Sequence, residues 1–167
     1  MPKINFLIIL VAAMIPMILG MLWYSNTLFG KAWMKAAEVT EEKLRAGNML
    51  ITFGTTFLFC IFIAFILQFM VIHQFSVASI LANETGISNP NSPISIYLKD
   101  FMDAYGNNFR TFKHGALHGF MAGLFFATPV IGMSSLFEQR GFKYLSIHAG
   151  FWVVSLSLMG GFICQFA

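Results

Sequence analysis

Four long apolar stretches, separated by polar segments, dominate the pattern of the chain. They cover about residues 4–23, 49–74, 114–137 and 142–166. The hydrocarbon core of a bilayer is about 30 Å thick and needs roughly 20 apolar residues in helical conformation. Because backbone groups inside lipid must find partners within their own segment, each stretch is expected to be a helix. The pattern therefore predicts an all-α membrane protein, an antiparallel bundle of four transmembrane helices that forms a single domain over residues 1–167.

Loop two, residues 83–113, carries a further helical pattern between the second and third stretches. Ser92 is a favourable N-cap, Pro93 suits the first helical position, and Gly106 suits the end. Apolar residues between them fall at helical spacing: Ile94, Tyr97, Leu98, Phe101 and Tyr105. An amphipathic helix attached to a membrane bundle is expected to lie in the membrane interface.

Two residues near the third stretch predict local features. Pro129 lies inside the stretch, where a kink is expected because proline has no backbone N–H. Gly141 is placed to end the third helix in a left-handed conformation. A short turn at this point predicts that the third and fourth helices form a hairpin.

The composition agrees with a membrane protein and excludes several other classes. Of the 167 residues, 57% are hydrophobic and 10% are charged, whereas soluble domains average about 25% charged residues. The net charge is +3, but there is no basic run of the kind that binds nucleic acid. We therefore expect the lipid bilayer, and not a nucleic acid, as the partner of this chain.

The distribution of Lys and Arg predicts an orientation in the membrane. Loops one and three would share one side, which holds Lys31, Lys35, Lys43, Arg45, Arg140 and Lys143. The other side holds Lys3, Lys99, Arg110 and Lys113. Because cytoplasmic loops carry the excess of positive residues, loops one and three are expected in the cytoplasm, with both termini outside.

The third stretch carries a small residue at every fourth position. This stripe consists of Gly115, Gly119, Gly123 and Ala127. Helices in lipid associate mainly through close packing at small residues, so the stripe predicts a helix contact. The contact could lie within the bundle or between two copies of the chain, and the sequence leaves both alternatives open.

Three histidines are expected at the end of the membrane that faces loop two. His73 ends the second stretch, and His114 and His118 begin the third, four residues apart and so on one helical face. Zinc takes three or four ligands of this kind, which makes zinc the one cofactor to consider. A proton site, or histidines that simply contact water at the interface, are the alternatives.

A second polar cluster is expected at the opposite end. It comprises Trp23, Tyr24, Lys31, Trp33, Lys35, Glu138, Arg140 and His148. Aromatic residues with flanking lysines are typical of membrane anchoring. Glu138 does not fit that explanation, since the helix dipole disfavours an acid at a C-terminus. A pairing of Glu138 with Lys31 or Lys35 would offset this cost.

Several short motifs of this chain resemble a known family. They are Trp23-Tyr24-Ser25, Leu28-Phe29-Gly30-Lys31, Trp33-Met34-Lys35, Leu136-Phe137-Glu138, His148-Ala149-Gly150 and the segment 155–160. In order and spacing they are similar to domain-of-unknown-function family 1761, small bacterial membrane proteins, except in loop two. The resemblance implies four helices and a bacterial inner-membrane location, and it implies no activity.

Three classes of function remain open from the sequence. The first is a non-enzymatic membrane subunit that packs with itself or with a partner in a membrane complex. The second is a transporter or channel for small solutes or ions, and the third is a metal-dependent membrane enzyme. The first is favoured because the four stretches contain few ionisable groups for coupling or catalysis. No catalytic residue is indicated.

Overall fold

The computed structural model describes residues 3–167, and no strand occurs within that range. Four helical segments are long and apolar enough to cross a membrane: α1 (Phe6–Trp23), α4 (Met49–Val71), the segment Phe112–Phe137 and α9 (Phe142–Phe166). The segment Phe112–Phe137 consists of α7 (Phe112–Ala122), the π-helix η1 (Gly123–Ala127) and α8 (Thr128–Phe137). The all-α prediction with four possible membrane spans is confirmed.

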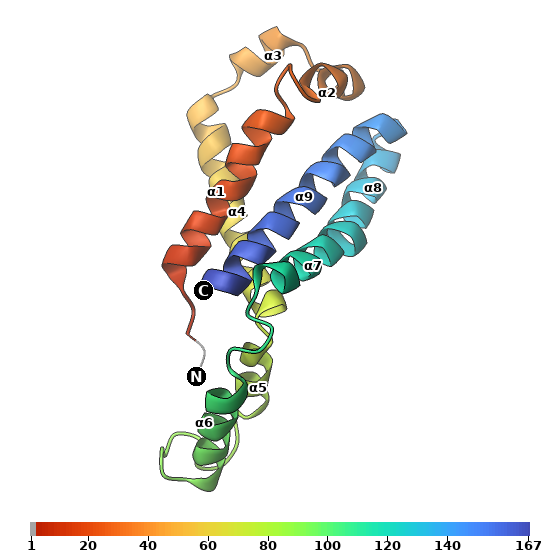
Figure 1. Ribbon diagram of the computed structural model, residues 1–167. Coiled ribbons are helices and arrows are strands. Elements are labelled where there is room, and N and C mark those ends of the chain that lie inside the picture. Colours follow the sequence, from red (N-terminus) through yellow and green to blue (C-terminus); the bar gives the residue numbers. More distant parts are fainter. Residues whose placement is uncertain (1–2) are drawn as a thin grey trace.

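Helix α9 is the centre of the fold. It contacts α1, α4, α7, η1 and α8, and it lies between the α1–α4 pair and the α7–α8 segment (Figure 1). Met159, Ile163 and Cys164 of α9 have no exposed surface. They pack with Ile9 of α1 and Leu67 of α4 in one apolar core. Helix α9 therefore connects the α1–α4 pair with the α7–α8 segment.

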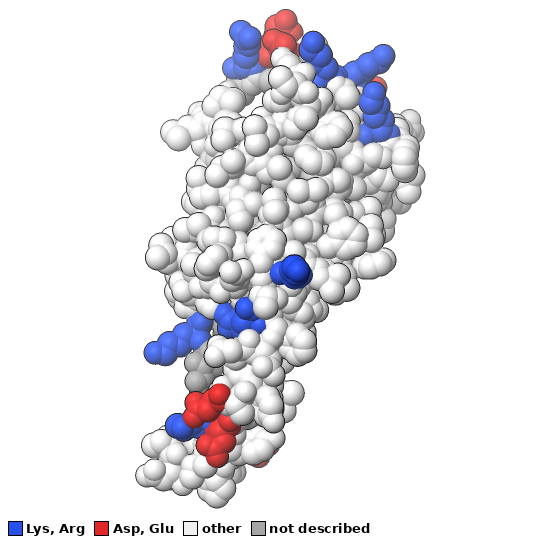
Figure 2. Space-filling model, viewed as in Figure 1, with Lys and Arg blue, Asp and Glu red and all other residues white. Residues whose placement is uncertain are grey.

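Charged residues gather near the two ends of the molecule. Figure 2 shows Lys, Arg, Asp and Glu side chains at the top of the molecule and again from its middle downward, with a broad uncharged band between the two groups. Large apolar side chains point outward in this band; Phe125 is 73% exposed and Phe62 is 57% exposed. Such extensive exposure of apolar surface suits a hydrocarbon environment rather than water.

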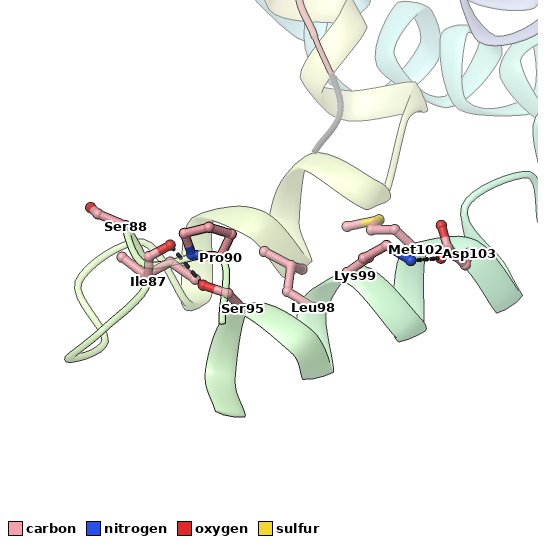
Figure 3. Close-up of a pocket in the computed structure, with 8 residues that line it drawn as sticks. All are labelled: Ile87, Ser88, Pro90, Ser95, Leu98, Lys99, Met102 and Asp103. Carbon is pink, nitrogen blue, oxygen red and sulfur yellow. Dashed lines mark hydrogen bonds and ion pairs between the residues drawn. The ribbon is translucent and has the colours of Figure 1, made fainter. Parts of the chain in front are cut away.

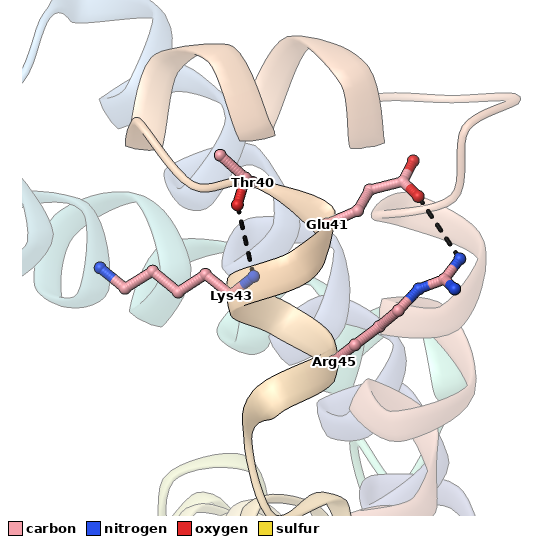
Figure 4. A network of polar contacts seen from close by, with 4 residues as sticks. All are labelled: Thr40, Glu41, Lys43 and Arg45. Atoms are coloured by element: carbon pink, nitrogen blue, oxygen red, sulfur yellow. Dashed lines mark hydrogen bonds and ion pairs between the residues drawn. The ribbon is translucent and has the colours of Figure 1, made fainter.

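Loop one folds into two short helices, α2 (Gly30–Ala37) and α3 (Glu41–Ala46). Both lie at the end of the molecule that holds the α8–α9 turn (Figure 1). The Thr40 side chain caps α3 by accepting a hydrogen bond from the Lys43 amide at 3.3 Å. One turn later, Arg45 approaches Glu41 at 3.5 Å (Figure 4). These contacts explain why a short, exposed sequence is helical.

Loop two folds into α5 (Gln74–Ile80) and α6 (Pro93–Tyr105). Helix α6 has the predicted caps: Ser92 accepts from the Ser95 amide at 3.2 Å, and Gly106 follows its last residue. Figure 1 shows both helices extending beyond the ends of the long helices, not along them. The Gln74 side-chain amide joins α5 to the end of α6 by donating to the Tyr105 carbonyl at 3.4 Å, and it also donates to the Asn108 carbonyl at 2.9 Å.

A cavity of about 300 Å³ lies within loop two, between the segment before α6 and α6 itself (Figure 3). Ser95 closes one side by donating to the Ile87 carbonyl at 2.9 Å. An exposed ion pair of Lys99 with Asp103, 2.5 Å apart, borders the other side. The cavity is thus a local feature of loop two.

The π-helix η1 ends two residues before Pro129. In a regular α-helix the Pro129 ring would clash with the carbonyl of Phe125, and no N–H would be available to bond it. The wider π turn lets the Thr128 amide donate to the Gly123 carbonyl, five residues earlier, and the Thr128 hydroxyl donates to the same oxygen at 2.9 Å. The effect of Pro129 is therefore absorbed by one wide turn.

The prediction for Gly141 is wrong. Gln139 is the left-handed residue, with a φ of 56°, whereas Gly141 is extended and precedes α9 as its N-cap. The Gln139 amide donates to the Leu136 carbonyl, and the Arg140 amide donates to the Ser135 carbonyl. These two bonds form a Schellman motif that closes α8 two residues before the glycine.

Candidate functional site

Three histidine side chains converge at the end of the molecule next to loop two. His73 Nε2 lies 3.2 Å from His118 Nε2 and 3.2 Å from His114 Nε2. One ligand nitrogen from each of the three residues lies within 4.8 Å of the others. The structure thus brings together the three histidines that the sequence singled out.

Two different segments position these side chains. Helix α4 ends at Val71, three residues before the predicted end, because Ile72 is extended, and this break places His73 at the start of α5. His114 and His118 lie one turn apart on α7, whose N-cap Thr111 accepts a hydrogen bond from the His114 amide at 3.3 Å. The end of α4 and the start of α7 therefore face each other at the three histidines.

The glycine stripe fixes α7 against α9. A Cβ atom added to Gly115 or Gly119 would overlap backbone atoms of α9, and one added to Gly123 would lie 2.6 Å from Val153 Cα. Ala127 continues the stripe as a partly buried residue beside the core. Since α9 of the same chain covers the three glycines, a second copy has no access to their face.

Cys164 and Arg110 hold the backbone on which the histidines stand. The Cys164 sulfur lies 3.3 Å from the Val71 carbonyl and 3.3 Å from the Phe109 carbonyl. Arg110 donates through Nε to the Cys164 carbonyl at 2.9 Å, and it also bonds the Ala167 carbonyl. A cation on the last carbonyls of α9 is favourable to the helix dipole.

Sequence reasoning missed this role because the partners are backbone atoms far away in the chain. The position of Cys164 at the end of the fourth stretch was the only available signal. Both Cys164 and Arg110 are positioning residues, since neither belongs to the group of possible ligands.

The histidine geometry suits a zinc-class ion. A tetrahedral site with Zn–N bonds of about 2.0–2.1 Å has nitrogens about 3.3–3.4 Å apart, close to the two separations of 3.2 Å here. His73 Nε2 carries either one hydrogen or one lone pair, so it cannot form full hydrogen bonds with both neighbouring nitrogens. A cation that accepts a lone pair from each of the three rings would satisfy all three nitrogens. His73 is exposed, so the group is open to the surface of the molecule.

At the opposite end the sequence-predicted cluster is built around Tyr24. Its hydroxyl lies 2.9 Å from His148 Nδ1, and its ring packs 5.2 Å from that of Trp33. Trp23 Nε1 donates to the Ile147 carbonyl at 3.1 Å, which ties the end of α1 to α9. Burial, with a smaller contribution from Tyr144, raises the pKa of the Tyr24 phenol above its ordinary value.

The charges of this cluster are paired differently from the prediction. Arg140 lies 3.3 Å from Glu38 of loop one and 3.9 Å from Glu138. Among residues 3–167, neither Lys31 nor Lys35 takes part in an ion pair. Loop one does meet the α8–α9 turn, but the cation comes from the turn and the acid from the loop.

The four apolar helices, with an uncharged band between two charged ends, define a multi-pass membrane protein. The chain belongs to the family described as protein of unknown function, DUF1761, whose family model matches residues 7–164. The resemblance in the sequence motifs is therefore confirmed, and the matched range includes loop two, which those motifs had left out. No curated protein and no solved structure matches the chain.

Proposed function

We propose that this membrane protein binds one zinc-class ion through His73, His114 and His118. The observation that carries the proposal is the convergence of three Nε2 atoms, with two separations of 3.2 Å. Neutral imidazole is a preferred ligand of zinc, and three protein ligands leave one coordination position for water. When bound, such an ion acts as a Lewis acid toward the molecule in that position.

The ion would join two parts of the chain that are distant in sequence. His73 precedes α5, and His114 and His118 follow α6, so loop two lies between the ligands. Metal binding would therefore order the base of loop two, because a bound ion stabilises the folded arrangement of its ligands. A structural ion of this kind suits a non-enzymatic membrane subunit, alone or in a complex.

The placement in the membrane is also proposed. Four consecutive spans in an antiparallel bundle would put loops one and three in the cytoplasm of a bacterium, following the Lys and Arg count. The histidine site, loop two and both termini would then lie on the outer side of the inner membrane. Helix α6 would lie at that surface, where Ile96 and Tyr97 are 47% and 59% exposed.

The orientation is tested by single cysteines in intact cells. Both native cysteines are buried, so an impermeant maleimide should label only Asn91→Cys from outside. Gln139→Cys, in the α8–α9 turn, should label only after permeabilisation. Labelling of both from the same side would contradict the proposed arrangement.

Metal binding is tested by purifying the whole protein in mild detergent and measuring zinc by mass spectrometry. We expect about one ion per chain after incubation with zinc and desalting. His73→Ala, His114→Ala and His118→Ala should each lower the zinc content more than tenfold. His148→Ala is the matched control, because His148 lies at the other end and should leave the zinc content unchanged. Equal zinc in His73→Ala and wild type would reject the site.

A further inference from the structure

An apolar groove lies between α4 and the η1–α8 segment. Its volume is about 520 Å³, and residues such as Phe62 and Met70 of α4, Ala127 of η1, and Trp152 and Leu156 of α9 line it. These residues come from the middle of three possible membrane spans. The medium around the groove is therefore hydrocarbon, and any occupant must be apolar.

A polar pocket of about 220 Å³ continues this groove toward the loop-one end. It is lined by Ser134, Ser135, Glu138, Tyr144 and His148. The groove and the pocket share three lining residues, Val130, Ile131 and Trp152. We call the continuous depression the trough; it is apolar over its inner part and polar where the helices end.

His148 gives the polar part an unused hydrogen-bonding group. Its Nε2 atom is buried and has no hydrogen-bond partner among residues 3–167. Its Nδ1 atom already faces the Tyr24 hydroxyl at 2.9 Å. If Tyr24 donates its proton to Nδ1, the neutral imidazole presents an N–H at Nε2. A buried donor without a partner is costly, so a ligand acceptor would stabilise this site.

We propose that the trough binds one phospholipid of the bilayer. One acyl chain lies in the apolar groove. His148 Nε2 is covered in this structure, so the side chains around the pocket shift when an ester carbonyl accepts its hydrogen bond. From the end of α7 along η1 into α8 the groove extends from Ala122 to Ile131, about 14 Å at 1.5 Å per residue. This length matches the hydrocarbon depth of one leaflet, about half of 30 Å.

The dimensions favour a chain over a helix from a second copy. A helix about 10 Å wide with a pitch of 5.4 Å fills roughly 400 Å³ per turn. The groove would therefore hold little more than one turn of such a helix. A second copy would also leave the polar pocket and His148 Nε2 without a partner, whereas a phospholipid fills both parts.

The test measures lipid retention by native mass spectrometry after reconstitution in phosphatidylethanolamine–phosphatidylglycerol nanodiscs and release into detergent. Wild type should retain one phospholipid per chain. Val130→Trp, which fills the trough where its two parts meet, should lower retention at least tenfold. Leu58→Trp is the matched control, because Leu58 and Val130 are both 46% exposed and only Val130 lines the trough. It should retain lipid as wild type does.

The polar part is tested in the same way. His148→Phe removes both ring nitrogens and should lower retention at least tenfold, whereas Tyr24→Phe removes only the hydroxyl and should retain more lipid. A single size-exclusion peak and a helical circular-dichroism spectrum like those of wild type report that each variant is folded. Equal retention in Val130→Trp and Leu58→Trp would overturn the proposal. A dimer that Val130→Trp dissociates, with no retained lipid in wild type, would overturn it in favour of a second copy.

Discussion

The two ends of the molecule place histidine in opposite surroundings. Next to loop two, His73, His114 and His118 converge, and His73 Nε2 lies 3.2 Å from the Nε2 atom of each of the other two. Next to loop one, His148 stands alone, with one nitrogen at the Tyr24 hydroxyl and the other without a partner. The same side chain thus suits a metal ion at one end and a hydrogen-bonding ligand at the other, because its neighbours differ.

The two ends also differ in how they are fixed. At the loop-two end, Arg110 and Cys164 bond backbone carbonyls, and the glycines of α7 contact α9 directly. At the loop-one end, Arg140 is only 29% exposed, but its partners Glu38 and Glu138 are 84% and 57% exposed. Close helix packing should therefore contribute more to stability than these ion pairs.

The largest effect is expected from Gly119→Leu, which breaks the α7–α9 contact. The added side chain would overlap the Leu156 carbonyl, so we expect a loss of about 3 kcal/mol or more of unfolding free energy. Thermal unfolding in detergent measures it. Gly54→Leu is the control, because a Cβ at Gly54 meets nothing within 4 Å. Equal melting temperatures for the two variants would contradict the packing described here.

A smaller effect, confined to the loop-two end, is expected from Cys164→Ala. The Val71 and Phe109 carbonyls lose their thiol partner, and the backbone before His73 and His114 is held less firmly. We expect about tenfold weaker zinc binding, as for other groups that orient metal ligands. Competition with a zinc chelator measures it. Cys60→Ala, at the other buried cysteine, is the control and should bind zinc as wild type does. An equal loss of zinc affinity in both variants would show that Cys164 does not position the histidines.

Arg140→Met tests whether the ion pairs at the loop-one end contribute less to stability than the helix packing at the loop-two end. An ion pair with exposed partners contributes about 0–1 kcal/mol, so the melting temperature should fall slightly. Zinc binding should not change. Glu38→Gln in the same protein should add little, since the pair is already broken. A loss of unfolding free energy well above this range would mean that the loop-one end is fixed as firmly as the loop-two end.

The smallest effect concerns a single carboxyl group on α3. Hydrogen bonds from its own backbone amide and from Thr40 lower the pKa of Glu42. The stabilisation linked to this shift is present above the ordinary pKa of the group and is lost as pH falls through the lowered pKa. Thr40→Ala should therefore move the Glu42 pKa back toward its ordinary value, as followed by NMR. An unchanged pKa would assign the shift to the Glu42 amide alone.

The sequence was sufficient to predict the elements and the ends at which the histidines lie. The four spans follow from the length of their apolar runs, and α6 follows from Ser92, Pro93 and Gly106, because these signals are local. The sequence suggested that His73 and His114 converge, because the end of the second span and the start of the third must lie on the same side of the membrane. The distances between their nitrogens depend on packing and were not predictable.

The features that sequence reasoning missed depend on contacts between distant segments. The pairing of Arg140 with Glu38 requires loop one to lie on the α8–α9 turn, which residue spacing does not predict. The Schellman motif at Gln139 shows that hydrogen bonding to Ser135 and Leu136 decided the turn, not the nearby glycine. The trough likewise depends on how helices from distant parts of the chain pack, and no motif marks it.

The most direct test of the account is X-ray absorption spectroscopy at the zinc edge on the purified, zinc-loaded protein. The histidine site predicts three imidazole nitrogens at about 2.0–2.1 Å, with one further light ligand, and the outer-shell scattering typical of histidine rings. His114→Ala should remove one imidazole from this shell or abolish zinc binding, and His148→Ala should leave the spectrum unchanged. A zinc shell without imidazole scattering, or a spectrum that His114→Ala does not alter, would contradict the central claim.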